Sequence, residues 1–267
     1  ASEVETLARD AGLPVIATAN INTPENIAAL KAFDADLFLV AAFGQLLKKE
    51  VLAIPKMFSL NVHGSLLPKY RGAAPIQRAI LDGQPLTGIT IQRMVLKMDA
   101  GDILLQMPTP IGQRENAAEL FQRLAILGGE ALVKSVRMVE SGEYTFTPQS
   151  ETEVKNAPKI LKEEALIDWM RPAETILRQI RGLQPWPIAE SKLGGVRLKI
   201  FAAEVAAAYG DLPPGSVTTD HKTRLFVTCG HSTALSLTQI QLENRKKLET
   251  RDFLMAYRGK FPFQNMG

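Results

Sequence analysis

Ser59-Leu-Asn-Val-His-Gly-Ser-Leu-Leu-Pro-Lys-Tyr-Arg-Gly-Ala-Ala-Pro-Ile-Gln77 passes from a strand, through a loop that contains glycine and proline, into the start of a helix. In the two-residue repeat of a strand, Asn61 and His63 point to one face, while Leu60 and Val62 point to the other. An amide and an imidazole side by side at the end of a strand predict a pair of groups that acts on a carbonyl.

Strand and helix patterns alternate on both sides of this segment. The apolar periodicity predicts strands over 15–18, 36–42 and 57–63, and helices over 24–33, 45–53 and 74–81. This alternation favours an α/β fold with a doubly wound, mostly parallel, Rossmann-like sheet. Ligands of such sheets lie at the carboxyl ends of the strands, which here lead into Phe43-Gly44 and His63-Gly64.

The next part of the chain predicts two more strands and a helical region. Strands over 87–96 and 103–107 flank the turn that holds Asp99 and Asp102. Aspartates in such a segment commonly only form the turn, so the residue types alone leave their chemical role open. The region 116–139 reads as two amphipathic helical segments with Gly128-Gly129 between them.

The composition pattern divides the chain into two domains. We expect a first domain over residues 1–143 and a polar linker with two prolines over 144–158. Residues 159–267 carry a helix over 172–181, many short β-like runs with turns, and a closing helix over 251–258. Several short strands predict a small C-terminal β-barrel of the OB-like kind.

Composition and charge limit the classes of function. Of the 267 residues, 46% are hydrophobic and 22% are charged, as in an ordinary globular protein, and no apolar run is long enough to span a bilayer. The single cysteine, Cys229, excludes an internal disulfide, so we expect a cytoplasmic protein. Residues 159–267 hold 16 basic and 11 acidic side chains. This excess fits either a polyanion partner or an ordinary solvated surface.

Only one of the three histidines has a suggestive setting. His221 and His231 lie in turn-like surroundings without cysteine or carboxylate neighbours at ligand spacing, so a zinc site is not expected. His63 lies at a strand end beside Asn61, although a histidine there is more often structural when it stands alone. No nucleophile elbow, P-loop or intact dinucleotide fingerprint is present, which weakens hydrolase, NTPase and dehydrogenase interpretations.

The combination of motifs resembles a known family. Asn61-x-His63-x-Ser-Leu-Leu-Pro-x-x-Arg-Gly72, followed by Met98-Asp-x-Gly-Asp102, closely resembles the formyltransferases that use 10-formyltetrahydrofolate. Arg71-Gly-Ala-Ala-Pro-Ile-Gln77 and Arg181-Gly-Leu-Gln-Pro-Trp-Pro187 look most like the branch of the family that acts on methionyl-initiator tRNA in translation initiation. The resemblance covers essentially the whole chain.

The resemblance implies a reaction and a set of site residues. An acceptor amine would attack the formyl carbon of the folate co-substrate, and no metal would be needed. The implied catalytic residues are Asn61 and protonated His63, which would bind the oxyanion, and Asp99, which would hold the imidazolium and relay protons. The residues implied for folate binding are Ser65, Leu66, Leu67, Pro68, Phe43 and Gly44.

The basic second domain then predicts a tRNA platform on a protein that we expect to be monomeric and not bound to membranes. Weaker candidates for tRNA contacts are Lys69, Arg71, Arg178, Arg181, Lys192, Arg197, Lys199 and the run 245–247. Trp169 and Trp186 are interpreted as structural rather than as stacking platforms for nucleotides.

Three alternatives and one departure from the family pattern accompany this interpretation. A formyltransferase for UDP-amino sugars and a 10-formyltetrahydrofolate hydrolase would share the catalytic trio, and a non-catalytic RNA-binding protein would use the first domain as a scaffold. Family members begin with a strand, a glycine-rich turn and a helix, whereas this sequence starts at Ala1 after such a unit. We therefore expect the N-terminal strand unit to be missing, which also leaves a mitochondrial location open.

Overall fold

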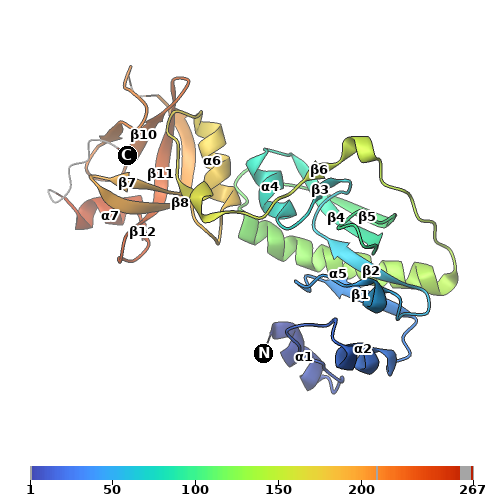
Figure 1. The fold of residues 1–267 in the computed structure, drawn as a ribbon. Helices are drawn as coiled ribbons and strands as arrows, with labels where there is room; N and C mark the ends of the chain where they lie inside the picture. Colours follow the sequence, from blue (N-terminus) through green and yellow to red (C-terminus); the bar gives the residue numbers. More distant parts are fainter. Residues whose placement is uncertain (1, 209, 259–265, 267) are drawn as a thin grey trace.

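The computed structural model describes residues 2–208, 210–258 and 266, which form two sheet-based units (Figure 1). The first unit is a mixed α/β layer, and the second is a curled antiparallel sheet with helices against it. Within the described residues, no helix is long and apolar enough to span a membrane.

The first sheet has the strand order β1-β2-β4-β5. Its strands are β1 (Leu37–Ala41), β2 (Phe58–His63), β4 (Leu86–Arg93) and β5 (Ile103–Pro110). Strands β1 and β2 run parallel, whereas β2–β4 and β4–β5 are antiparallel. The α/β class is confirmed, and the described part of the sheet is mixed because the turn at 97–102 folds β5 back on β4 as a hairpin.

One long helix covers one face of this sheet. Helix α5 (Ala117–Ser141) starts with a capping box between Asn116 and Glu119, and it is unbroken. The two helical segments expected over 116–139 were therefore wrong. Gly128 lies where the helix crosses the sheet, and a Cβ there would stand 3.0 Å from Val62 Cγ1. This glycine serves the close approach of helix and sheet rather than a turn.

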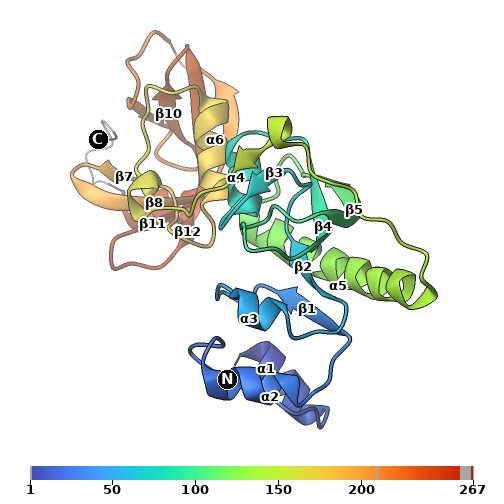
Figure 2. The same ribbon diagram turned by 45° about the vertical axis from the view of Figure 1, so that its right-hand side comes forward.

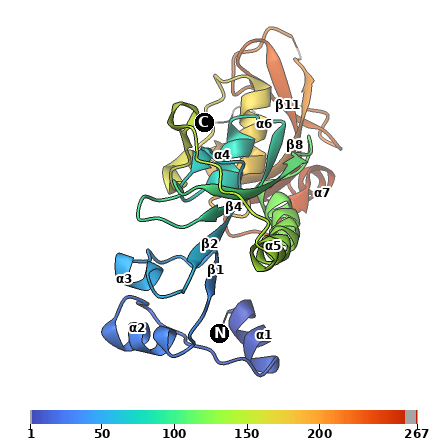
Figure 3. The ribbon, with the colours of Figure 1, turned by 90° about the vertical axis from the view of Figure 1, so that its right-hand side faces the viewer.

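The opposite face carries shorter elements, as Figure 3 shows, with α3 and α5 on opposite sides of β1 and β2. The helices before β2 are α1 (Glu3–Asp10), α2 (Pro24–Lys31) and α3 (Lys49–Leu52). No strand forms over 15–18, so that expectation was wrong. Strand β1 is also less covered than its apolar sequence predicts, because Leu39 remains 47% exposed.

The second unit is built on a sheet of strand order β7-β8-β11-β10-β9, with β12 paired to β11. Its strands are β7 (Glu190–Leu193), β8 (Val196–Ala207), β9 (Val217–Thr219), β10 (Leu225–Cys229), β11 (Thr233–Leu242) and β12 (Leu248–Glu249). Helices α6 (Ala173–Gly182) and α7 (Thr250–Ala256) pack on it around a core that includes Trp169, Ile176 and Phe253. The expected C-terminal β-domain is confirmed as a curled half-barrel, in which β7 and β9 do not pair within the described residues.

The segment between the two units lies on the first one. It contains two short 3-10 helices, η1 (Glu151–Glu153) and η2 (Lys162–Ala165), and strand β6 (Lys155–Asn156), which pairs in parallel with β3 (Lys69–Arg71). Helix α4 (Pro75–Leu81) packs against α6, so these two helices join the units (Figure 2). The ion pair between Arg78 Nη1 and Glu164 at 2.6 Å links α4 to η2 at this contact.

Candidate active site

The strand β2 delivers Asn61 and His63 to one face of the first sheet, as its alternation predicts. Asn61 stands opposite Gln92, and His63 stands opposite Thr90, on the neighbouring strand β4. Leu60 is fully buried within the core on the α5 face. The amide of Asn61 makes no hydrogen bond to a described residue, so it remains available to a ligand.

His63 is buried and has an acceptor oxygen near each ring nitrogen. Its Nε2 lies 2.9 Å from the main-chain oxygen of Tyr70, and its Nδ1 lies 3.6 Å from Asp99 Oδ1. Only 6% of the side chain is exposed. The Asp99 carboxylate is therefore the charged group closest to the ring, and the main-chain oxygen of Tyr70 is the ring's hydrogen-bond partner.

Asp99 is held by donors from two other segments. The main-chain N–H of Gly72 donates to its Oδ2, and Gln92 Nε2 donates to its Oδ1, both at 2.9 Å. The residue has a φ of 50°, in the left-handed region that aspartate tolerates better than most side chains. The structure thus brings Asn61, His63 and Asp99 together, although their positions in the sequence are separate.

Asp102, the other aspartate of this turn, has a structural contact. Its main-chain oxygen accepts a hydrogen bond from Arg93 N and so stabilises the β4–β5 hairpin.

The loop after His63 is fixed by side chains of the sheet. The Ser65 hydroxyl donates to Lys69 O at 2.6 Å, and Thr90 Oγ1 donates to Ser65 O at 2.6 Å. Gln106 Nε2 donates to Leu67 O at 2.8 Å. Ser65 is therefore buried, and its hydroxyl already donates a hydrogen bond within the loop. Its role is to hold the loop that borders the site, and its hydroxyl proton is not free for a ligand.

The residues that the resemblance implied for folate fall into two groups. Leu66, Leu67 and Pro68 line a groove of about 430 Å³, together with residues 69–70, 84–87 and Glu153. Phe43 is 44% exposed and lies with Gly44 just beyond the carboxyl end of β1, outside the lining of that groove. One group thus follows β1 and the other follows β2, its parallel neighbour in the sheet.

Two of the arginines expected to contact tRNA, Arg71 and Arg181, donate hydrogen bonds to other segments of the protein, and a third, Arg178, lies at the contact between the two units. Arg71 is buried, and its guanidinium donates to Gln149 Oε1 and Glu151 Oε1, each at 3.0 Å. Arg181 Nη1 donates to the main-chain oxygens of Gly112 and Glu115, and its burial lowers the pKa of the guanidinium. Arg178 packs against Gly83 of the first unit. Arg71 and Arg181 thus hydrogen-bond to segments distant in the chain, whereas the half-buried Arg178 hydrogen-bonds within its own helix, to Glu174 O and Thr175 Oγ1.

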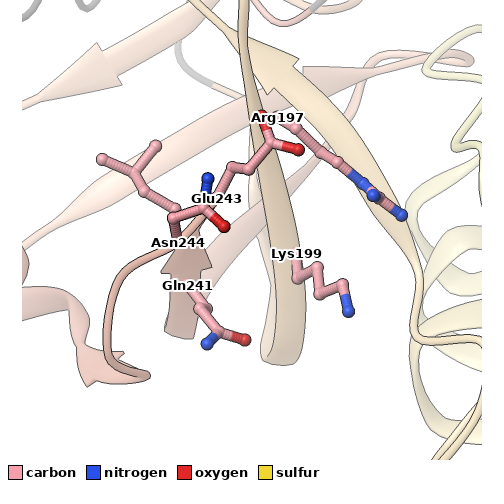
Figure 4. Close-up of a pocket in the computed structure, with 6 residues that line it drawn as sticks. Arg197, Lys199, Gln241, Glu243 and Asn244 are labelled. Atoms are coloured by element: carbon pink, nitrogen blue, oxygen red, sulfur yellow. The ribbon is translucent and has the colours of Figure 1, made fainter.

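The other candidates lie on the surface. Lys69 and Lys192 are exposed. Arg197 and Lys199 line a groove of about 170 Å³ on the second sheet with Gln241, Leu242, Glu243 and Asn244. Lys199 and Gln241 stand opposite each other on β8 and β11 and extend in the same direction (Figure 4). Arg197 also pairs with Glu190, which leaves Lys199 as the less neutralised cation of this groove.

The remaining aromatic and histidine candidates separate by burial. Trp169 is buried and donates from Nε1 to Ser191 Oγ at 2.9 Å, whereas Trp186 is 53% exposed. His221 and His231 are exposed residues with positive φ in turns of the second unit. Among the described residues, no group of three or more His, Cys, Asp and Glu side chains could hold a metal ion.

Sequence reasoning missed the polar residues that support the trio. Gln92 is buried and contacts Asp99, and the linker residue Gln149 donates from Nε2 to the main-chain oxygens of Asp99 and Gly101 at 2.9 and 2.6 Å. Gln92 stands opposite Asn61 on the neighbouring strand, so a correct prediction of the β2–β4 register would have placed Gln92 at the site. No local pattern marks Gln149.

Comparison with known proteins gives consistent matches over nearly the whole chain. A family model described as "Formyl transferase" matches residues 5–136, and one described as "Formyl transferase, C-terminal domain" matches residues 159–258. The methionyl-tRNA formyltransferase of Agathobacter rectalis is 40% identical over 91% of this chain and 78% of its own length. That of Methylococcus capsulatus is 40% identical over 96% of this chain and 82% of its own length.

Solved structures share the fold at lower identity. HypX from Aquifex aeolicus, in complex with tetrahydrofolic acid, has a TM-score of 0.66 and 21% identity over 87% of this chain and 41% of that one. An N-formyltransferase from Helicobacter canadensis, in complex with folinic acid and dTDP-3-aminofucose, has a TM-score of 0.66 and 18% identity over 89% of this chain and 82% of its own. Given the identity and coverage of its bacterial relatives, this chain belongs to the methionyl-tRNA formyltransferase family.

Proposed function

We propose that this protein transfers the formyl group of 10-formyltetrahydrofolate to the α-amino group of methionyl-initiator tRNA. The observation that carries the proposal is the convergence of Asn61, His63 and Asp99 at the end of β2, with His63 Nδ1 at 3.6 Å from Asp99 Oδ1. Family membership supplies the substrate class, and this cluster supplies groups suited to an acyl transfer.

In the proposed reaction, the amine nitrogen attacks the formyl carbon and a new C–N bond forms. The carbonyl electrons move to oxygen, and the tetrahedral intermediate then collapses by breaking the bond to folate nitrogen. The free amide of Asn61 donates to the oxyanion. Both nitrogens of His63 already face Tyr70 O and Asp99, so the imidazolium acts chiefly through its charge.

Proton movement in this scheme runs through Asp99. The attacking amine must lose a proton, and the leaving folate nitrogen must gain one. The Asp99 carboxylate is 13% exposed, so a water molecule can reach it and pass the proton between the two nitrogens. Gly72 N–H and Gln92 Nε2 hold the carboxylate in place during this exchange.

We propose two binding surfaces for the substrates. Phe43 and Gly44 on one side and the Ser65–Pro68 loop on the other bound the folate site, since they flank the catalytic trio. For tRNA we propose phosphate contacts at Lys69, Lys192, Arg197 and Lys199, with Lys199 chief among them. Arg71, Arg178 and Arg181 contribute to these surfaces only by holding the segments that carry them.

We also propose the division into a catalytic domain over 1–143, a linker over 144–158 and a tRNA-binding domain over 159–267. The two family models support it, because they end at residue 136 and begin at residue 159. A monomer in the cytoplasm is the proposed working form, with the mitochondrial matrix as the alternative compartment.

The decisive experiment measures transfer of labelled formyl from 10-formyltetrahydrofolate to methionyl-initiator tRNA. Transfer that is abolished by His63→Ala, with tRNA binding retained, is the expected result. Transfer to a nucleotide-linked amino sugar instead of tRNA would identify the sugar-modifying branch, and formate release without an acceptor would identify a hydrolase. If His63→Ala leaves tRNA binding and every measured activity unchanged, the protein is a non-catalytic RNA-binding protein.

A further inference from the structure

The segment between the two units is bound to the first unit at several points. Thr147 exchanges two main-chain hydrogen bonds of 2.8 Å with Ile103 at the start of β5. Ala157 N donates to Arg71 O at 2.7 Å, and β6 pairs with β3. Tyr144 and Phe146 stack edge-on against Phe58. Residues 144–157 therefore form a strap across the two loops that carry the active site, and we call them the strap.

Gln149 is the strap residue that hydrogen-bonds to the main chain of the loop over residues 97–102. Its Nε2 donates to Asp99 O at 2.9 Å and to Gly101 O at 2.6 Å, and it lies 3.4 Å from Gln92 Oε1. Both carbonyl groups belong to the turn that places the Asp99 carboxylate beside His63. One side-chain amide thus donates to two main-chain oxygens, one on each side of Ala100 in the sequence.

The other end of the Gln149 amide is fixed by Arg71. The buried guanidinium donates from Nε to Gln149 Oε1 at 3.0 Å, and from Nη2 to Glu151. A guanidinium donates and never accepts, so this contact selects the orientation in which the Gln149 oxygen faces Arg71 and the nitrogen faces the loop. Lys97 adds a second cation to Glu151 at 3.0 Å.

This restraint acts on a turn whose central residue, Asp99, has a left-handed backbone conformation. Asp99 has a φ of 50°, in the left-handed region that few side-chain-bearing residues other than asparagine and aspartate adopt readily. Gly72 N–H and Gln92 hold the carboxylate, and Gln149 holds the main-chain carbonyl of the same residue. The side chain and the backbone of Asp99 are fixed by separate groups.

We propose that Gln149 is a positioning residue for formyl transfer, which sets the Asp99 carboxylate against His63 through its bonds to the carbonyls of Asp99 and Gly101. The proposal rests on the proposed function, because it assigns Asp99 a part in the reaction. A displacement of about 1 Å at a catalytic group can cost 100-fold in rate. Loss of the amide therefore lowers kcat by about 10- to 100-fold and leaves both KM values within about two-fold.

The test compares two glutamine-to-methionine variants of the full chain. Gln149→Met keeps an unbranched side chain of similar length and removes every hydrogen bond. Gln179→Met is the matched control, since Gln179 Nε2 also donates to two main-chain oxygens, those of Glu164 and Leu166, but lies on α6. The expected result is a fall in kcat for Gln149→Met and no fall for Gln179→Met.

A double-mutant cycle with Asp99→Asn separates positioning from general loosening of the fold. If Gln149 acts through Asp99, adding Gln149→Met to the Asp99→Asn variant lowers kcat by less than about two-fold. An equal loss in both backgrounds, or unchanged kcat in the single variant, overturns the proposal. We expect the main-chain amides of residues 97–102 to exchange hydrogen faster in Gln149→Met than in the wild type, and at the wild-type rate in Gln179→Met.

If the proposed function itself is wrong, the variants give results that differ from those expected when only the positioning role of Gln149 is wrong. In that case Asp99→Asn itself retains formyl transfer, or the wild-type chain shows no transfer to methionyl-tRNA. Failure of the positioning proposal alone leaves Asp99→Asn impaired while Gln149→Met matches the wild type in rate and in hydrogen exchange.

Discussion

Gly72 is the position where a single methyl group should disturb both the fold and the active site. Its φ is 122°, which side-chain-bearing residues rarely adopt, and a Cβ there would stand 2.8 Å from Ala157 O. Its N–H also donates to Asp99 Oδ2 at 2.9 Å. Gly72→Ala must therefore either rotate its own backbone, which moves its N–H away from the Asp99 carboxylate, or push the strap away, which moves Gln149 from the carbonyls of Asp99 and Gly101.

The expected cost follows from these contacts. A residue forced into such a conformation costs about 1–3 kcal/mol. Loss of the bond from Ala74 N to Ala157 O, which is 3.2 Å long here, adds about 1 kcal/mol. We expect Gly72→Ala to lower the free energy of unfolding by about 2–4 kcal/mol and Tm by roughly 5–15 °C, and to lower kcat as well.

Thermal and urea unfolding followed by circular dichroism measure the effect. Gly129→Ala is the control, because Gly129 lies within α5 and a Cβ there would meet no atom within 4 Å. That exchange should raise stability by about 0.5–1 kcal/mol, since alanine loses less backbone entropy than glycine in a helix. If Gly72→Ala unfolds within about 0.5 kcal/mol of the wild type, the strap does not press on this residue as the geometry requires.

Three other predictions concern the reaction, the tRNA surface and the thiol. Asp99→Asn should lower kcat by about 100- to 10,000-fold with Tm nearly unchanged, and single-turnover formylation that matches the wild type would contradict the role of this carboxylate. Lys199→Ala should weaken tRNA binding and reduce the slope of log affinity against log salt by about one, whereas Arg178→Ala should leave that slope unchanged in filter-binding titrations. Burial raises the pKa of the Cys229 thiol to about 11 from an ordinary value of 9.0. The thiol therefore stays protonated in the folded state, so stability should fall as pH rises above about 9, and iodoacetamide should label it at pH 8 only after unfolding.

The sequence predicted best where a local pattern determines the structure. The alternation of Leu60, Asn61, Val62 and His63 is reproduced by β2, because one face packs on α5 and the other meets β4 and the loops. The helix that follows Pro75 and the two-sheet organisation were found for the same reason. Each depends on neighbours in the chain or on a short repeat.

Long-range contacts account for what the sequence did not reveal. The break expected at Gly128-Gly129 was wrong because the first glycine meets Val62 across the helix–sheet contact rather than ending the helix. Arg71 and Arg181 were named from the sequence as candidates for tRNA contacts, and nothing in the sequence indicated their intramolecular acceptors, which lie 78 and 66 positions away along the chain. Gln149 contacts Asp99 at a separation of 50 residues, and no periodicity or spacing encodes such a pair.

The strap has a consequence for dissecting the protein into fragments. A truncation that ends at residue 143, where the composition changes, would retain all three members of the trio but remove Gln149, β6 and the Ala157 carbonyl. A truncation that ends after residue 157 would keep them. The smallest autonomous catalytic fragment should therefore be defined by hydrogen bonding rather than by composition, and the longer of these two fragments is the one to express.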